Sequence, residues 1–329
     1  MTGAHAPHHL DAGRDREVPP RVGRVEPDPP LVAEGTTDDP TLETIIDTVI
    51  DWFGHHGRDL PWRHDGTTPW AVLVSEVMLQ QTPVVRVLPR WTDWMQRWPT
   101  PADLADAPTA EVLRAWDRLG YPRRALRLQE CAQMIVREHG GVVPRGIEAL
   151  RALPGIGEYT AAAVTAFAHR ERAVVVDTNI RRVLARSVQG LALPAPSYSA
   201  AERALATRSL PPQPPRSVAW NQAVMELGAL VCTARSPRCA QCPLAEAGCA
   251  WVAAGSPAAP EGSRRRQAFE GTDRQLRGQI MAVLRRDGEA THAALLTLDA
   301  ADPERVARCE ASLVADGLAV RSAGRLRLP

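Results

Sequence analysis

Two carboxylates in this chain occupy sequence surroundings that would give them different acidities. Glu76 is the only charged residue between Trp70 and Leu79, a stretch that is otherwise apolar except for Ser75. A carboxyl group inside such a helix would be buried, and burial raises its pKa. Glu76 is therefore expected to hold a proton near neutral pH and to donate it as a general acid. The alternative is a buried glutamate that pairs with a neighbouring arginine.

Asp177 follows the apolar run Ala173–Val176 and precedes a helical pattern from Ile180 to Val188. By itself this placement also fits an aspartate that only caps the helix. One neutral and one ionised carboxyl group are what hydrolysis of a glycosidic bond requires. The first protonates the leaving group and the second stabilises a cationic sugar. The bond between a base and its deoxyribose is a bond of this type.

A glycine-containing turn provides a way to hold a phosphate. Leu153-Pro154-Gly155-Ile156-Gly157 separates a helical pattern over residues 147–152 from another that begins near Glu158. Glycines allow the backbone N–H groups at the start of the second helix to approach an anion closely. This contact would hold DNA without reading its sequence.

Four cysteines lie within eighteen residues: Cys232, Cys239, Cys242 and Cys249. Clustered thiolates suit a soft metal, and both zinc and a [4Fe–4S] cluster accept this ligand type. The spacing differs from the paired Cys-x-x-Cys of zinc ribbons, and it leaves both possibilities open. The clustering favours an intracellular metal site over disulfides.

Composition excludes several functions. The 329 residues carry a net charge of +1, so a surface for nucleic acid must be a local patch. All 39 basic residues are arginine, which excludes a lysine Schiff base. No apolar run is long enough to cross a membrane, and the N-terminus lacks the apolar segment of a secretory signal. We expect a cytoplasmic protein.

The pattern of elements predicts an all-α fold with four parts. Residues 1–40 are predicted to be a disordered tail, 41–254 a helical domain that includes the cysteine loop, and 255–267 a linker. Residues 268–329 suggest three helices, over 273–286, 290–296 and 303–315, followed by a hairpin, as in a winged-helix module. The helical domain is expected to consist of two modules with the active site in the cleft between them.

Two loops carry aromatic residues beside arginines. In Gly57–Arg63, Trp62 either anchors the core or lines a ligand pocket. In Tyr121-Pro122-Arg123-Arg124, the tyrosine and arginines either stack on bases and contact phosphates or form a plain surface turn.

The motifs Ser75–Thr82, Leu153–Gly157, Val176–Asn179 and the cysteine set together resemble the helix-hairpin-helix base-excision glycosylases. Within these they resemble the MutY-like adenine DNA glycosylases, from about Thr41 to Trp251. The resemblance implies excision of adenine mispaired with 8-oxoguanine or guanine in double-stranded DNA, by a monomer. In the related endonuclease III branch a lysine that attacks the sugar stands at the position of Tyr159. Tyrosine at this position implies a glycosylase that uses water and lacks a strong β-lyase step.

The resemblance also implies roles for individual residues. Glu76 would protonate adenine and Asp177 would stabilise or trap the sugar cation, with Asn179 and Tyr159 supporting that site. Residues lining the adenine pocket would be Leu60, Trp62, Arg63 and Gln222. Gln81 and Tyr121 would enter the base stack, which lowers the cost of flipping the base out. Gly155 and Gly157 would bind phosphate, and Cys232, Cys239, Cys242 and Cys249 would bind a [4Fe–4S] cluster.

The sequence departs from the family pattern in two places. Six residues precede Cys249, Pro243 to Gly248, where the family has five. The last 60 or so residues do not resemble the family's usual C-terminal domain, which is similar to nucleotide pyrophosphohydrolases and contacts 8-oxoguanine. Discrimination of 8-oxoguanine from guanine is therefore expected to be weaker, or to depend on Gln81, Tyr121 and the C-terminal module.

Two other functions fit parts of the pattern. The same scaffold could excise thymine or uracil mispaired with guanine, although protonation of a leaving base by Glu76 favours a purine. A non-catalytic, metal-bearing DNA-binding protein would explain the hairpin and the cysteines, but it gives no purpose to a buried glutamic acid.

Overall fold

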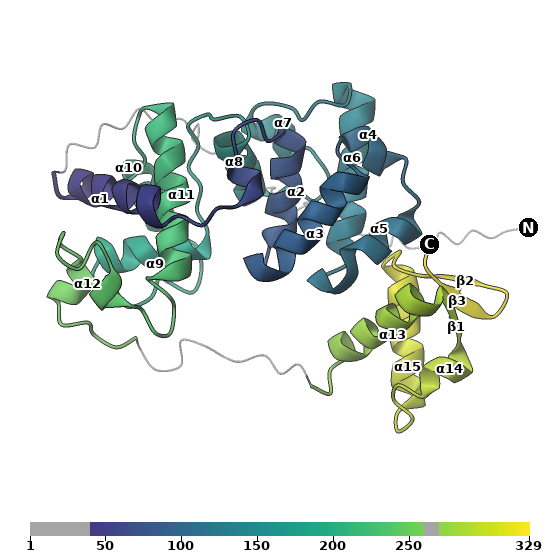
Figure 1. Ribbon diagram of the computed structural model, residues 1–329. Coiled ribbons are helices and arrows are strands. Elements are labelled where there is room, and N and C mark those ends of the chain that lie inside the picture. Colours follow the sequence, from purple (N-terminus) through teal and green to yellow (C-terminus); the bar gives the residue numbers. More distant parts are fainter. Residues whose placement is uncertain (1–39, 260–269) are drawn as a thin grey trace, which may run out of the picture. The chain divides into compact units, whose positions relative to one another are not determined.

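The computed structural model describes residues 40–259 and 270–329, and the fold is helical throughout the first of these ranges (Figure 1). The predicted disordered tail and most of the predicted linker lie outside the described residues, so the predicted domain boundaries stay predictions. None of the described helices is long and apolar enough to cross a membrane.

One group of helices packs around a tryptophan-rich core. The helices of this group are α2 (Pro69–Leu79), α3 (Val84–Arg97), α4 (Pro101–Ala105), α5 (Thr109–Trp116), α6 (Arg123–His139) and α7 (Ile147–Arg151). Trp94 and Trp116 are fully buried here, with ring centroids 5.7 Å apart in an edge-to-face arrangement. Such aromatic pairs add to the stabilisation from apolar burial.

In the second group, the first helix of the domain packs with helices that follow the glycine turn in the sequence. This group contains α1 (Pro40–His56), α9 (Thr178–Ser187), α10 (Ala200–Arg208), α11 (Pro214–Leu230) and the short α12 (Ala250–Ala253). Helix α1 packs on α11, although about 170 residues separate them in the chain (Figure 1). The N-terminal helix therefore completes a module that is built mainly from the later part of the sequence.

Helix α8 (Glu158–Phe167) is the wall between the two groups. Ala161 and Val164 belong to the tryptophan-rich core, while Ala162, Ala163 and Ala166 belong to the other. Small side chains allow helices on both sides to approach closely. This explains why the sequence of α8 is rich in alanine and why its apolar residues are not confined to one face of the helix.

A second close approach occurs between α9 and α11. A Cβ atom added at Gly228 would lie 2.6 Å from the Cβ of Asn179, a distance that real Cβ atoms do not adopt. Only glycine therefore allows α11 to lie this close to the first turn of α9, which begins at Asp177.

The C-terminal residues form three helices and a small sheet. The elements are α13 (Asp273–Asp287), β1 (Glu289–Thr291), α14 (His292–Leu296), α15 (Pro303–Ala315), β2 (Val320–Ser322) and β3 (Arg325–Arg327). Strand β3 pairs antiparallel with both β1 and β2. The three predicted helices and the closing hairpin are present, but the prediction that a helix starts at Ala290 is wrong. Ala290 and Thr291 pair with β3, and the helix starts only at His292, capped by Thr291.

Candidate active site

A single cavity of about 360 Å³ lies between α2, α8, α9 and α11 and contains both carboxylates. A cavity of this size is typical of a small-molecule site. The cavity wall includes all eight residues expected at the reacting bond and around the base: Glu76, Asp177, Tyr159, Asn179, Leu60, Trp62, Arg63 and Gln222. The structure thus brings together residues that lie up to about 160 positions apart in the chain.

Glu76 is buried in the middle of α2, with 5% of its surface exposed. Thr68 caps this helix by accepting a hydrogen bond from the Ala71 N–H, and Pro69 occupies its first turn. The pKa of Glu76 is raised to about 7, because burial and the nearby Asp177 raise it more than the hydrogen bond from Tyr159 and the charge of Arg63 lower it. The expected burial and raised pKa of Glu76 are both confirmed.

The alternative in which Glu76 pairs with a neighbouring arginine does not describe its surroundings. Its Oε2 accepts a hydrogen bond from the Tyr159 hydroxyl at 3.2 Å. The nearby arginine, Arg63, instead donates to Glu226 at 2.8 Å.

Asp177 caps α9, but it also lines the cavity. Its Oδ1 accepts from the Ile180 N–H at 2.7 Å, and its Oδ2 accepts from the Asn179 side-chain amide at 2.7 Å. The pKa of Asp177 is raised, because burial raises it more than these donors and Arg182 lower it. Two carboxyl groups that interact this closely titrate as a pair. Because hydrogen-bond donors stabilise the ionised form of Asp177, we assign the proton of the pair to Glu76.

Two charged residues of the cavity wall, Arg58 and Glu226, were not among the predicted site residues. The Glu226 side chain is 1% exposed and receives hydrogen bonds from the Arg58 Nε at 2.7 Å and the Arg63 Nη2 at 2.8 Å. Burial alone would raise the pKa of Glu226, but these bonds outweigh it and lower the pKa to about 2. The ion triad of Arg58, Arg63 and Glu226 fixes one wall of the cavity.

Gln81 and Tyr121, expected to enter the base stack, lie outside the cavity wall, on two neighbouring turns. Gln81 follows α2 with φ 53°, and Tyr121 precedes α6 with φ 46°. Both side chains are exposed, Tyr121 to 42%. These left-handed backbone conformations are uncommon for residues other than glycine.

The glycine turn joins α7 to α8 as expected, although its two glycines differ. Gly155 has φ 78°, and a Cβ atom there would lie 2.8 Å from the Cβ of Arg127. Gly157 caps α8 in an extended conformation, and a Cβ atom there would meet open space. Gly155 is therefore needed by the fold, while Gly157 leaves its surroundings open to an approaching group.

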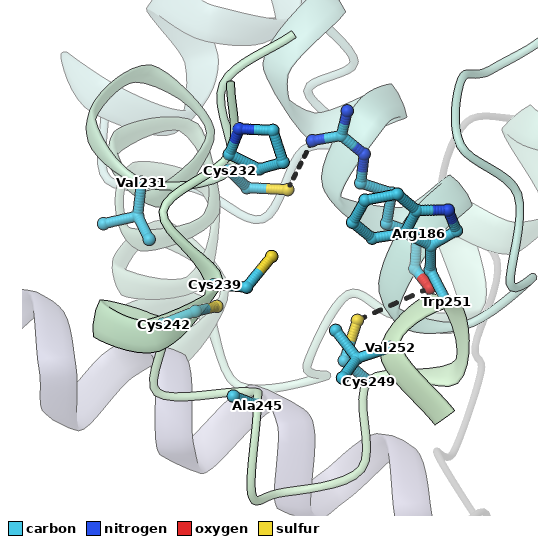
Figure 2. A pocket seen from close by; sticks show the side chains of 10 residues that line it. Arg186, Val231, Cys232, Cys239, Cys242, Ala245, Cys249, Trp251 and Val252 are labelled. Atoms are coloured by element: carbon cyan, nitrogen blue, oxygen red, sulfur yellow. Dashed lines mark hydrogen bonds between the residues drawn. The ribbon is translucent and has the colours of Figure 1, made fainter. Parts of the chain in front are cut away.

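The four cysteines lie around one pocket between α9 and the loop that follows α11 (Figure 2). Arg186 lies at its edge, with Nη1 3.4 Å from the Cys232 sulfur and its guanidinium 4.9 Å from the Trp251 ring. Burial, and then the other thiols, raise the pKa of Cys239, and burial raises that of Cys242 to about 11. Cationic iron would stabilise these four thiolates together, so the donor set fits an iron–sulfur cluster.

Arg182 connects the cysteine loop to the cavity. Its Nη2 donates to the Asn179 side-chain oxygen at 2.8 Å and to the Gly228 carbonyl at 2.6 Å, and its Nε donates to the Cys232 carbonyl at 2.6 Å. Asn179 in turn donates to Asp177.

Family models match two parts of the chain. Residues 74–208 match the HhH-GPD superfamily of base excision DNA repair proteins, and residues 232–247 match the iron–sulfur binding domain of endonuclease III. Among solved structures, a thermostable thymine-DNA glycosylase has a TM-score of 0.57 at 28% identity, covering 65% of this chain and 97% of that one. The fold is that of a base-excision DNA glycosylase, and the cofactor is a [4Fe–4S] cluster rather than zinc.

Similar proteins indicate which kind of DNA glycosylase this chain is. The adenine DNA glycosylase of Mycobacterium tuberculosis is 51% identical over 288 residues, which covers 87% of this chain and 94% of the relative. The human adenine DNA glycosylase is 43% identical over 205 residues, covering 60% of this chain and 37% of the relative. The chain belongs to the adenine DNA glycosylase family.

Proposed function

We propose that this enzyme excises adenine mispaired with 8-oxoguanine or guanine, using water as the final nucleophile. One observation carries the proposal: Glu76 and Asp177 lie in the same cavity, and the pKa of Glu76 is raised to about 7. A protonated Glu76 would give its proton to the departing adenine, most readily at N7. The ionised Asp177 would stabilise the oxocarbenium-like sugar or trap it covalently.

The remaining residues of the cavity position these two groups and the base. Tyr159 donates to Glu76, and Asn179 donates to Asp177, so each carboxyl group has one side-chain partner that fixes its direction. Leu60 and Trp62 supply apolar contacts, while Arg63 and Gln222 supply polar ones. We add Arg58 and Glu226 to this set, because their ion triad fixes Arg63.

We propose that the N–H groups at the start of α8, beside Gly155 and Gly157, hold a DNA phosphate, and that Gln81 and Tyr121 occupy the space left by the flipped base. Cys232, Cys239, Cys242 and Cys249 would ligate the cluster. The cluster, when bound, supplies structural cross-linking of the loop after α11. The enzyme would act as a monomer on chromosomal DNA in the cytoplasm, since one chain supplies the whole cavity.

The C-terminal residues lie close enough to the Tyr121 turn to influence it. Arg123 pairs with Asp316 at 3.3 Å, and the Arg274 guanidinium lies 4.6 Å from the centre of the Tyr121 ring. These contacts support the proposal that discrimination of 8-oxoguanine from guanine depends on Gln81, Tyr121 and residues 270–329.

The test is base release from a panel of duplexes that carry adenine opposite 8-oxoguanine, adenine opposite guanine, thymine opposite guanine, or uracil opposite guanine. Alkali converts each abasic product into a strand break. We expect breaks at adenine with the wild type and far slower formation of breaks with Glu76→Gln. Breaks only at thymine or uracil would favour a pyrimidine glycosylase, the activity that the name of the 28% identical solved structure suggests. Binding without any base release would favour a non-catalytic DNA-binding protein.

A further inference from the structure

One arginine contacts both turns that carry Gln81 and Tyr121. Arg124 lies in the first turn of α6, directly after the Tyr121 turn, and its guanidinium is directed inward. Its Nη1 donates to three carbonyl oxygens at the end of α2: Val77 at 2.8 Å, Met78 at 3.2 Å and Gln80 at 2.7 Å. These carbonyls belong to a helix end, where intrahelical partners run out.

The same guanidinium also binds the other turn. Its Nη2 donates to the Leu119 carbonyl at 3.4 Å and the Gly120 carbonyl at 3.1 Å, immediately before Tyr121. It also donates to the Thr82 hydroxyl at 3.0 Å. Thr82 strengthens the link, because its own hydroxyl donates to the Leu119 carbonyl at 3.1 Å.

Aromatic rings hold the guanidinium from the sides. Its central carbon lies 5.2 Å from the Trp116 ring centre and 5.6 Å from that of Tyr121, distances at which cation–π attraction operates. Burial lowers the pKa of Arg124 to about 10, which leaves it charged at neutral pH. The sequence suggested that Arg124 contacts phosphates or lies on a plain surface turn. The structure shows an inward-facing cation whose Nη1 and Nη2 groups both donate to the protein, while its buried Nε has no hydrogen-bond partner among the described residues.

We propose that Arg124 is a positioning residue for base flipping: it fixes the spacing between Gln81 and Tyr121 so that both side chains enter the DNA stack together. Both residues have a positive φ, and each of their turns needs an outside contact to hold that conformation. Arg124 supplies this contact for the two turns at once. The inference rests on the proposed function, in which Gln81 and Tyr121 replace the flipped base.

Lysine cannot replace Arg124 in this role. Its ammonium group offers three donors from one point, whereas Arg124 serves six acceptors with a planar fork. Arg124→Lys thus keeps the positive charge but loses the planar arrangement of hydrogen-bond donors. Arg137→Lys is the matched control, because Arg137 lies in the same helix but is exposed and, within the part of the chain that the structure describes, pairs with its neighbour Glu138.

The experiment measures single-turnover release of adenine, together with the fluorescence of 2-aminopurine placed at the target position, which increases on unstacking. We expect Arg124→Lys to slow release by about 10- to 100-fold and to reduce the fluorescence change. Arg137→Lys should leave both unchanged. Thr82→Val, which removes only one hydroxyl of the link, should have a smaller effect in the same direction and serves if Arg124→Lys does not fold.

Measuring Arg124→Lys both in the wild type and in a variant without the two positioned side chains separates a positioning effect from general destabilisation. In the Gln81→Ala/Tyr121→Ala double variant, adding Arg124→Lys should cause no further slowing, because the residues it positions are gone. Equal slowing in both backgrounds, or none in the wild-type background, would overturn the proposal. Wild type that releases no adenine would instead refute the proposed function, so the two failures are distinguishable.

Discussion

The Tyr159 hydroxyl lies 3.2 Å from the Glu76 carboxyl group and donates a hydrogen bond to it inside the cavity. At this position the endonuclease III branch places its attacking lysine. Here the residue is a hydrogen-bond donor to the acid, and the pKa of Tyr159 itself is raised well above its usual value by burial and by Glu76. Tyr159 therefore stays protonated, and its hydroxyl contacts Glu76.

The rate of adenine release should depend on pH on the alkaline side of neutrality. Because the pKa of Glu76 is about 7, the rate of adenine release should fall as the pH rises through neutrality. Glu76→Gln should lower the single-turnover rate by about 10²- to 10⁴-fold and remove this dependence. A profile that stays flat to pH 9 in the wild type would contradict the role of Glu76 as the acid.

The same carboxyl group should make stability depend on pH. The folded protein binds a proton on Glu76 between its ordinary pKa of 4.5 and about 7, so the wild type should lose stability as the pH rises across this range. Glu76→Gln lacks this titration. At pH 8 it should be more stable than the wild type by at most about 3 kcal/mol, and at pH 4 equally stable. Denaturant unfolding at both pH values measures the difference.

Removal of the Tyr159 hydroxyl should move the pH profile without abolishing activity. Its hydrogen bond lowers the pKa of Glu76, so Tyr159→Phe should shift the alkaline limb to higher pH. A double variant with Glu76→Gln should show no limb to shift. An unmoved profile in Tyr159→Phe would mean that the hydrogen bond does not persist when DNA is bound.

The absence of lysine from the sequence predicts how the product behaves. Borohydride should trap no covalent enzyme–DNA adduct through a lysine side chain, and strand breaks should appear only after alkali. Digestion of any trapped species and mass analysis of the attached peptide would check this. An adduct on a residue other than Asp177 or the N-terminal amine would contradict the water-based mechanism.

The ion triad should contribute to stability and to substrate binding. Glu226→Gln leaves Arg58 and Arg63 without a carboxylate in a buried setting, so we expect a loss of about 2–4 kcal/mol and a higher KM. Because the pKa of Glu226 is lowered to about 2, its stabilisation should disappear as the pH falls from 4.5 to 2. Glu138→Gln is the control, since its ion pair with Arg137 is exposed and contributes little.

The cluster can be tested independently of catalysis. The purified protein should be brown, absorb near about 400 nm and contain four irons per chain. Cys242→Ser should reduce the iron content and the thermal stability, whereas Cys309→Ala, outside the cysteine pocket, should retain the colour. A colourless protein with one zinc ion would overturn the assignment.

The sequence was informative where one residue stood out from its surroundings. Glu76 is conspicuous in an apolar helix, and Asp177 lies at a helix start after an apolar run, so both could be predicted. Glu226 could not, because α11 is apolar on most faces and its two arginine partners lie about 165 positions away. The same holds for Arg124, which is one of two consecutive arginines in an ordinary-looking turn. Long-range ion pairs leave no periodic pattern in the sequence.

Strand β1 shows a different limit. Three residues are too few to display an alternating pattern, and Ala290 favours a helix by propensity. Pairing with β3, which follows about 35 residues later, determines the conformation instead.

Gly228 has no side chain, touches no part of the cavity and would be passed over in any inventory of reactive groups. Yet the missing methyl group at this position determines how near α11 can come to the first turn of α9, the helix that Asp177 caps. A survey of inactivating substitutions should therefore find position 228 as intolerant as the acid itself, with even alanine displacing the sugar-facing group from its partner across the cavity.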